Sequence, residues 1–311
     1  MSALTVSKDE EKRLKGQGFL NNRGTDEFSA RVITVNGKVT AAQHRCMAEA
    51  AEKFGNGNLT YTTRLSVEIQ GIPYEKIEKF QEFIAKEGLE TGGTGAKVRP
   101  VVSCKGTTCQ YGLLDSYGIS EKIFERFYKG YRQVALPHKF KIAVGGCPNN
   151  CVKPNLNDVG IIGQRIPHFD SEACKGCKKC AIEAACPNKV AKVVDGKLHI
   201  DEELCRHCGR CVGKCPFHSI PDGTYGFKIY IGGRWGKKIS HGKALNRIFT
   251  SEEEALDVIE KAILLFKDRG LKGERFAETI ERIGFENAEK TNYWQKKSSG
   301  KKNGNFVQIE I

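Results

Sequence analysis

The chain has 311 residues, of which 39% are apolar and only 9 are prolines, which favours a globular protein with two or three compact units. The first twenty residues lack the apolar segment of a secretion signal, and no apolar run is long enough to cross a bilayer, so we expect no membrane association. The net charge of +13 predicts anionic partners or ligands, and nucleic acid, an acidic protein, or a polyanionic cofactor with a small anionic substrate would each fit.

Cysteine is abundant, with 13 residues. In a chain without a secretion signal, clustered cysteines indicate metal binding, because cytoplasmic thiols stay reduced and do not form a disulfide framework. We therefore expect a cytoplasmic metalloprotein. Twelve of the cysteines fall into closely spaced groups, whereas Cys46 lies on a predicted helix and is expected to be a buried small side chain.

In chain order, residues 1–92 are predicted to form a small α+β domain. Its elements are a strand from residue 28, a helix over 40–54, a strand over 59–69 and a helix over 73–86. Gly55 is expected to end the first helix, because glycine is favoured just beyond a helix end. A glycine-rich joint, ETGGTG at 90–95, then separates this domain from the rest of the chain.

A second domain is predicted to begin with residues 93–167 and to resume over 221–295. Its elements are a helix near 120–128, strands near 139–144, 159–162 and 227–233, and a helix from Ser251, which forms a capping-box pattern with Glu254, to Gly270. The segment between the two parts, 168–220, is rich in cysteine and lysine and shows little periodicity, as expected of a module that folds around metal. Residues 296–311 are expected to be a flexible basic tail.

Eight cysteines of this inserted segment repeat the spacing of bacterial two-cluster ferredoxins. In that spacing three cysteines hold one [4Fe–4S] cluster, and a fourth, followed by proline, reaches the other cluster. Zinc sites are disfavoured, because four-ligand sites explain neither the third CxxC step nor the Cys-Pro endings. The predicted ligand sets are Cys174, Cys177, Cys180 and Cys215 for one cluster, and Cys186, Cys205, Cys208 and Cys211 for the other.

Four further cysteines form two pairs, Cys104-x4-Cys109 and Cys147-x3-Cys151. Their spacing is compatible with a third iron–sulfur cluster or with a zinc ion. Pro148 and two asparagines predict a tight turn in the second pair. The glycines before this turn leave room for a bulky group to approach the backbone.

Three parts of the sequence are LTYTTRLSVEIQGI, CKGTTC with GGCPNNC, and LPHKFK. Together they resemble the sirohaem-dependent sulfite and nitrite reductase family, in particular its anaerobic and dissimilatory sirohaem subunits with an inserted ferredoxin domain. The resemblance covers residues 20–165 and 222–290. It implies an α+β fold in which a ferredoxin-like half-domain precedes a domain for sirohaem and a [4Fe–4S] cluster, here interrupted by the two-cluster module. The implied ligands of this third cluster are Cys104, Cys109, Cys147 and Cys151, and Cys151 also ligates the sirohaem iron. The family usually has five residues between the first two cysteines, and this chain has four.

The resemblance also implies a site for a small anion, formed by Arg64, Arg99, Lys139 and Lys141. Arginines offer forked donors, and lysines act as point charges and proton sources. Lys139 and Lys141 alternate on a predicted strand and therefore face the same side. Related nitrite reductases typically have asparagine at the second lysine, which favours sulfite here. The carboxylates of sirohaem are expected to bind Arg234, Lys237 and Lys238.

The expected activity is the six-electron reduction of sulfite to sulfide, with electrons relayed through the ferredoxin module. Reduction of nitrite to ammonia at the same site is an alternative, and a non-catalytic iron–sulfur electron carrier is an alternative of another class. Nucleic-acid binding is disfavoured, because it does not explain why TTR, KFK and GGCPNNC occur together.

No glycine-rich fingerprint for a nicotinamide or flavin cofactor follows a predicted strand. Electrons are therefore expected from an external ferredoxin or a flavoprotein subunit. Larger single-chain members of the family contain two copies of the half-domain with the site between them. The single copy here implies a homodimer or a higher oligomer.

Overall fold

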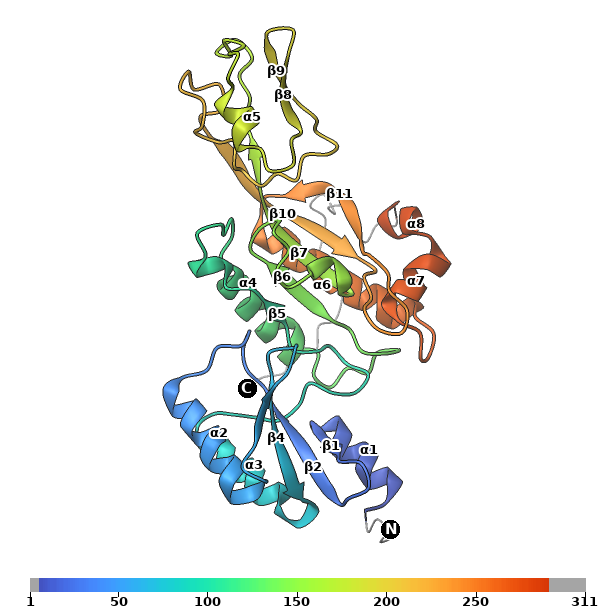
Figure 1. Cartoon of the computed structure of the whole chain (residues 1–311). Helices are drawn as coiled ribbons and strands as arrows, with labels where there is room; N and C mark the ends of the chain where they lie inside the picture. The colour runs from blue at the N-terminus through green and yellow to red at the C-terminus, as the bar shows by residue number, and fades with distance from the viewer. Residues whose placement is uncertain (1–5, 291–311) are drawn as a thin grey trace.

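The N-terminal part of the chain is built around a four-stranded antiparallel sheet. The computed structural model describes residues 6–290 (Figure 1). The strands of this sheet are β1 (Phe19–Asn21), β2 (Glu27–Val32), β3 (Leu59–Tyr61) and β4 (Val67–Pro73). They lie in the order β1-β2-β4-β3, and each pairs antiparallel with its neighbour.

Three helices pack against this sheet. They are α1 (Lys8–Gly16), α2 (Ala41–Phe54) and α3 (Ile77–Ala85), the last preceded by the 3-10 turn η1 (Tyr74–Lys76). The predicted helix over 40–54 is confirmed: Thr40 Oγ1 accepts a hydrogen bond from Gln43 N at 3.1 Å, and Gly55 is the C-terminal cap. Cys46 is buried in α2 as expected.

The predicted single strand over 59–69 is wrong, because the chain reverses direction between β3 and β4. The hydroxyls of Thr62 and Ser66 lie 2.8 Å apart across this turn, and Leu65 has a φ of 63°, in the left-handed region. Arg64 therefore lies on a hairpin turn. A side chain at such a turn extends beyond its own sheet and can reach a neighbouring one.

The second part of the chain contains a mixed five-stranded sheet. Its strands are β5 (Val102–Ser103), β6 (Ile142–Gly145), β7 (Val159–Pro167), β10 (Gly223–Ile231) and β11 (Lys243–Phe249). The order is β11-β10-β7-β6-β5, with β5, β6 and β7 parallel and the other two antiparallel to their neighbours. All four residues of β6 are buried, as expected of a central parallel strand.

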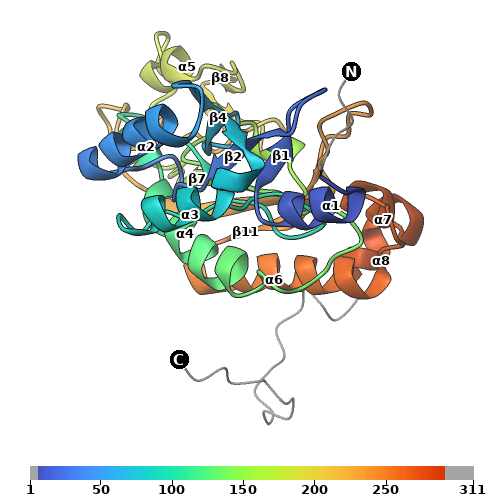
Figure 2. The same ribbon diagram turned by 90° about the horizontal axis from the view of Figure 1, so that it is seen from below.

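The helices of this part are α4 (Ser116–Ile123), the π-helical segment η3 (Phe124–Lys129), α6 (Glu252–Arg269), α7 (Phe276–Ile283) and α8 (Phe285–Lys290), with 3-10 turns η2 (Gly106–Thr108) and η4 (Pro154–Leu156). The predicted helix near 120–128 thus begins earlier and changes pitch at Phe124. Ser251 caps α6 as predicted. Arg126 of η3 bonds to Glu260 of α6 at 2.6 Å, so η3 and α6 lie side by side under the sheet (Figure 2).

Residues 168–222, called the insert below, leave the sheet at the end of β7 and return at the start of β10. These two strands pair without interruption from Val159 with Ile231 to Pro167 with Gly223. The insert projects beyond this end of the sheet (Figure 1). Although its sequence shows little periodicity, the insert contains α5 (Ala181–Ala185) and the hairpin of β8 (Ala191–Val194) and β9 (Lys197–Ile200). Its small core is made by Ile182, Ala191, Leu198 and Ile220.

Within residues 6–290, no helix combines the length and the apolar character needed to cross a membrane. The predicted basic tail at 296–311 lies outside the described residues.

Candidate functional site

The four side chains predicted to bind an anion come from separate parts of the chain and meet at one end of strands β5 and β6 of the five-stranded sheet. Arg64 comes from the β3–β4 turn, Arg99 precedes β5, and Lys139 and Lys141 precede β6. Their charges influence one another, since Arg64 and Lys139 act on Lys141, and Arg99 acts on Lys139. The structure therefore brings all four residues together.

The two lysines lie just outside the strand in which they were expected, because β6 begins at Ile142. Phe140, the residue between them, still forms a parallel bridge with Val98. The side chain of Phe140 is fully buried. Because neighbours in an extended segment point to opposite faces, both lysines lie on the side away from Phe140.

Arg64 is held by main-chain and side-chain acceptors of the second sheet. Its Nη2 donates to the carbonyl oxygens of Pro100 at 2.7 Å and Ile142 at 3.3 Å, and its Nη1 donates to Asn157 Oδ1 at 3.2 Å. Burial, followed by repulsion from Arg99, lowers the pKa of Arg64 to about 10. The carbonyls fix the guanidinium without neutralising its charge.

The remaining three predicted cations also sit where positive charge is disfavoured. Burial, followed by repulsion from Arg64, lowers the pKa of Lys141 to about 8. Burial, followed by repulsion from Arg275, lowers the pKa of Lys139. The pKa of Arg99 falls to about 10, mainly through burial, and its guanidinium donates to the carbonyl oxygen of Gly93.

A buried ion pair beside the lysines was not predicted. Arg275, the N-cap residue of α7, is 4% exposed, and Asp158, which precedes β7, is fully buried. Arg275 Nη2 lies 2.9 Å from Asp158 Oδ2, which also accepts a hydrogen bond from Lys141 N at 2.8 Å. The partners are 117 positions apart, so no local pattern could have revealed the pair.

Arg64, Arg99, Lys139, Lys141 and Arg275 are called the cation cluster below. They carry five positive charges against one fully buried carboxylate, that of Asp158. In addition, the Nε atoms of the three arginines are buried and lack a hydrogen-bond partner. Unpaired buried donors and uncompensated buried charges are costly, so the cation cluster is chemically suited to an anion that accepts hydrogen bonds.

The three cations predicted to bind sirohaem carboxylates lie on the loop after β10. Arg234 Nη1 lies 2.7 Å from Glu278 Oε1 in α7, and Lys238 Nζ lies 3.8 Å from the same oxygen. Lys237 is exposed. Repulsion from Arg234 also lowers the pKa of Lys139, although less than burial and the charges of Arg275 and Arg99 do. This loop therefore adjoins the cation cluster. Glu278 is an acidic neighbour that sequence analysis missed.

Cys104, Cys109, Cys147 and Cys151 form the Cys104 group, which lies on two loops in close contact. A Cβ added to Gly146 would lie 2.6 Å from Gly106 Cα, so these two glycines bring the loops together. Gly146 N donates to Cys104 Sγ at 3.1 Å. Burial raises the pKa of Cys147, and the three other cysteines of the group raise it further by repelling its thiolate. The structure thus gathers all four thiols.

The cation cluster and the Cys104 group occupy opposite ends of the same strands. Arg99 precedes β5 and Cys104 follows it, while Lys141 precedes β6 and Cys147 follows it. The two strands are parallel. Five residues of extended chain span about 16 Å, so the anion site and the thiols of one chain are well separated.

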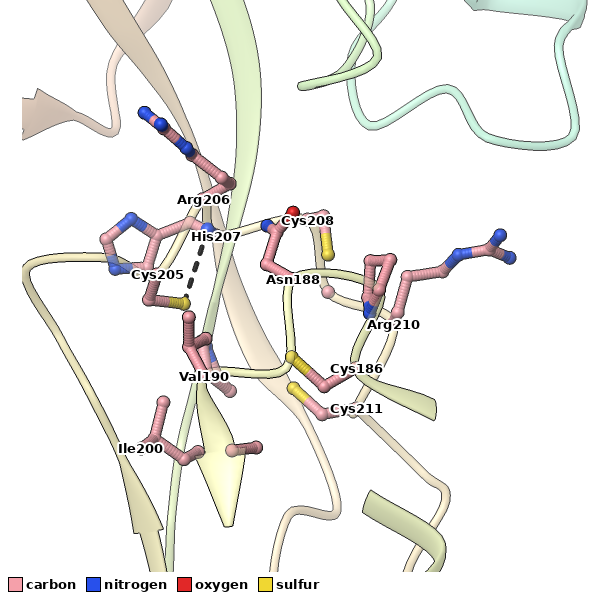
Figure 3. A pocket seen from close by; sticks show the side chains of 14 residues that line it. Cys186, Asn188, Val190, Ile200, Cys205, Arg206, His207, Cys208, Arg210 and Cys211 are labelled. Atoms are coloured by element: carbon pink, nitrogen blue, oxygen red, sulfur yellow. Dashed lines mark hydrogen bonds between the residues drawn. The ribbon is translucent and has the colours of Figure 1, made fainter. Parts of the chain in front are cut away.

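Cys186, Cys205, Cys208 and Cys211 form the Cys205 group in the insert. All four line one small cavity, and their sulfur atoms point into a shared space (Figure 3). Burial raises the pKa of Cys211 to about 11, and repulsion from the other three thiols contributes. The structure therefore assembles the crossed set in which Cys186 joins the downstream cysteines.

Cys174, Cys177, Cys180 and Cys215 form the Cys177 group. Cys174, Cys180 and Cys215 pack against the small core of the insert. The loop that carries Cys177 touches the β8–β9 turn, since a Cβ on Gly176 would lie 1.8 Å from the carbonyl oxygen of Gly196.

Across residues 6–290, no three His, Cys, Asp or Glu side chains are close enough to bind a single metal ion.

The sequence of the chain is similar to those of known proteins over most of its length. Residues 94–297 match the family described as nitrite and sulphite reductase 4Fe-4S domain, and residues 21–87 match the nitrite/sulfite reductase ferredoxin-like half domain. The chain is 30% identical over 240 residues to the coenzyme F420-dependent sulfite reductase of Methanocaldococcus jannaschii, covering 76% of this chain and 37% of that protein. It is 27% identical over 269 residues to the dissimilatory-type sulfite reductase subunit alpha of Allochromatium vinosum, covering 80% of this chain and 64% of that subunit.

A solved structure shows the same fold. The crystal structure of dissimilatory sulfite reductase I matches 92% of this chain and 73% of its own, with a TM-score of 0.68 at 22% identity. This chain therefore shares its α+β architecture with that enzyme and corresponds to only part of the longer relatives.

Proposed function

Because the chain belongs to the nitrite and sulphite reductase 4Fe-4S family, we propose that it reduces sulfite to sulfide in a six-electron reaction. The observation that carries this proposal is the convergence of Arg64, Arg99, Lys139 and Lys141 in one place with unmet positive charge. Sulfite is a small dianion whose oxygen atoms suit forked arginine donors and lysine point charges.

Reduction of nitrite to ammonia is the second candidate, because it requires the same number of electrons and a similar anion site. The resemblance of the KFK segment to sulfite reductases favours sulfite, since related nitrite reductases typically have asparagine at the position of Lys141. The family itself includes both activities.

The donor sets suit sirohaem and three [4Fe–4S] clusters, one cluster for each cysteine group. When bound, sirohaem and its cluster would bind the substrate anion and pass to it the electrons that an external donor provides. Cys151 is exposed, so its sulfur would be accessible to both groups. Arg234, Lys237 and Lys238 are proposed to bind the carboxylates of sirohaem, because their loop adjoins the cation cluster and is open to solvent.

The chain's own side chains are proposed to hold the anion and to deliver protons. The carbonyls of Pro100 and Ile142 fix Arg64 before any ligand arrives, which lowers the cost of orienting its donors. Lys141, whose pKa is about 8, is largely protonated at neutral pH and releases its proton readily. Such a group is suited to act as a general acid.

The active site is proposed to form between two copies of the chain. The cation cluster of one copy would meet the Cys104 group of the other, because the two sets lie at opposite ends of β5 and β6 in one chain. A two-fold symmetric homodimer forms two such sites. Trp235 and Ile239, each 57% exposed on the loop beside the cation cluster, offer apolar surface for this contact.

Electrons are proposed to come from an external ferredoxin or a flavoprotein subunit in the cytoplasm. Residues 168–220 would receive them as a two-cluster ferredoxin module. This part of the proposal rests on the eight cysteines of the insert and on the gathering of the Cys205 group around one cavity.

The test is an anaerobic visible spectrum of the purified protein with iron and sulfide analysis, followed by titration with sulfite and nitrite. Sirohaem bands, about twelve irons per chain for three cubane clusters, and a spectral shift with sulfite are expected. Faster turnover of nitrite than of sulfite would favour the second candidate. About eight irons without sirohaem would instead indicate an electron carrier.

A further inference from the structure

The two cysteine groups of the insert differ in their distance from the Cys104 group. The Cys205 group is tied directly to the sheet, because Arg165 N of β7 donates to the carbonyl oxygen of His207 at 2.7 Å. Arg165 also forms a parallel bridge with Cys208. These main-chain contacts hold the loop around Cys208 against the end of β7, the end at which the Cys104 group lies.

One side-chain contact and two shared cavities relate the same loop to the two cysteine loops of the sheet. The guanidinium of Arg210 lies 4.6 Å from the ring centre of Tyr111, two positions beyond Cys109. A cavity of about 410 Å³ is lined by both Cys147 and Cys208, and a second, of about 430 Å³, is lined by Cys208 and the turn after Cys147. Cys208 and Cys147 of the Cys104 group therefore line the same cavity.

The Cys177 group lies farther out. Its loop packs on the β8–β9 turn at Gly196, and this hairpin extends away from the five-stranded sheet (Figure 1). Lys197, beside that turn, donates to the carbonyl oxygen of Ser171 at 3.0 Å, which fixes the start of the loop. Within the described residues, no member of the Cys177 group lines either of the two cavities that lie between Cys208 and the loop after Cys147.

The surface around the Cys177 group is basic and partly apolar. Lys175, Lys178 and Lys179 alternate with the cysteines of its loop and are exposed, and Lys214 is exposed beside Cys215. Over residues 170–200 and 211–220 there are seven lysines and four carboxylates, the latter being Asp170, Glu172, Glu183 and Asp195, so positive charge prevails. Two large apolar side chains, Val194 at 49% and Phe217 at 47%, are also exposed there. Such a surface is complementary to an acidic protein with an apolar centre.

We infer that an acidic one-electron donor protein docks on Lys175, Lys178, Lys179 and Lys214, and that electrons pass from the Cys177 group through the Cys205 group to the Cys104 group. This inference rests on the proposed function. In each transfer the donor protein is oxidised by one electron and the insert is reduced by one electron. The lysines attract and orient the donor, and the loop around Cys208 connects the insert to the sheet.

The first experiment measures the rate at which the holoprotein oxidises a reduced acidic [2Fe–2S] ferredoxin, followed by stopped-flow absorbance without sulfite. The variant Lys175→Glu/Lys178→Glu/Lys179→Glu is expected to lower the second-order rate at low salt by about tenfold or more and to flatten its salt dependence. Reduced methyl viologen, a small donor that needs no docking surface, should react at an unchanged rate.

The matched control reverses three exposed lysines of α1, at the other end of the molecule: Lys8→Glu/Lys12→Glu/Lys15→Glu. It has the same change in net charge and is expected to keep most of the ferredoxin rate. An equal loss in both triple variants, or no loss in the first, would overturn the docking face. Both triple variants leave the cysteines intact, so their iron content should stay at the wild-type value.

The order of the groups is tested by electron paramagnetic resonance of the fully reduced protein. Cys208→Ala is expected to remove the magnetic interaction between the insert and the Cys104 group, whereas Cys177→Ala should preserve it. Each variant should lose about four irons. The reverse pattern would overturn the order. A protein without sirohaem would refute the proposed function, while the ferredoxin rates of the lysine variants would still test the docking face.

Discussion

Lys141 is the lysine of the cation cluster whose pKa departs furthest from its ordinary value. Burial and the neighbouring Arg64 disfavour its charged form and lower its pKa to about 8. An anion bound beside it would favour the charged form again. The charged form of Lys141 can therefore bind an anion, and near neutral pH this form can also donate a proton.

We predict that kcat/KM for sulfite, measured with reduced methyl viologen, falls as the pH rises above about 8, because Lys141 of the free enzyme then loses its charge. Lys141→Gln should lower kcat/KM by about 100-fold and abolish this decline. Lys141→Arg should shift the decline to higher pH. Substrate ionisation is the same for all three proteins, so a decline that persists in Lys141→Gln would contradict the assignment.

The Asp158–Arg275 pair stabilises the segment that carries Lys141. Asp158→Asn leaves Arg275 buried without a counter-ion, and we expect it to lower the free energy of unfolding by about 3–5 kcal/mol in urea. Adding Arg275→Met should recover part of this loss. The control is Glu121→Gln, which breaks an exposed pair with Lys38 and should cost less than about 1 kcal/mol. Equal losses for Asp158→Asn and Glu121→Gln would show that the buried pair has no special role.

Among the elements, the two loops of the Cys104 group depend on a contact between glycines. Gly106 and Gly146 approach so closely that a Cβ on either would meet the Cα of the other within 2.7 Å. The sequence suggests that Gly145 and Gly146 admit a bulky group, but the nearest neighbour of Gly146 is Gly106 in the opposite cysteine loop. The glycines therefore set the spacing between the two pairs of thiols.

Gly146→Ala is expected to force the loops apart and to reduce the iron content by about four atoms per chain, with loss of sirohaem. The insert should retain about eight irons, because its ligands lie elsewhere. The control is Gly16→Ala in α1, where nothing lies within 4 Å of the added carbon. An iron content unchanged by Gly146→Ala would show that the loop spacing is not critical.

At the scale of the whole molecule, the part proposed to receive electrons and the part proposed to bind the anion lie far apart in the chain's structure. Electrons would arrive at the insert, which projects from one end of the sheet (Figure 1), and pass to the Cys104 group. The cation cluster lies at the opposite ends of β5 and β6, where Arg64 of the N-terminal sheet contacts them. This separation makes the single chain an incomplete active site and gives the proposed dimer a specific test.

Co-expression of Cys151→Ala chains with Lys141→Gln chains should restore about a quarter of wild-type activity, although each variant alone is inactive or nearly so. Random pairing yields half mixed dimers, each with one intact site of two. A mixture of Cys151→Ala with Cys104→Ala should restore nothing, because both changes affect the same side of the site. Absence of recovery in the first mixture, with mixed dimers isolated through two tags, would contradict a shared site.

Local sequence predicted features whose partners are near in the chain. Ser251 with Glu254 identified the start of α6, because an N-cap acts within one turn. The assignment of Cys186 to the downstream cysteines followed from a known spacing. The reversal at Arg64 was missed because Leu65, a residue rarely found at positive φ, occupies the left-handed position there.

The sequence by itself determined the α+β class, which depends on periodicity, and the family, which the resemblance of a few short segments identified. It predicted the cysteine groupings from short, fixed spacings. Only the tertiary structure revealed the Asp158–Arg275 pair, the contact of the insert with the loop after Cys109, and the placement of cations and thiols at opposite ends of β5 and β6. These relationships join residues that are far apart in the chain, and packing between elements decides them. Periodicity and spacing along the chain carry no information about such contacts.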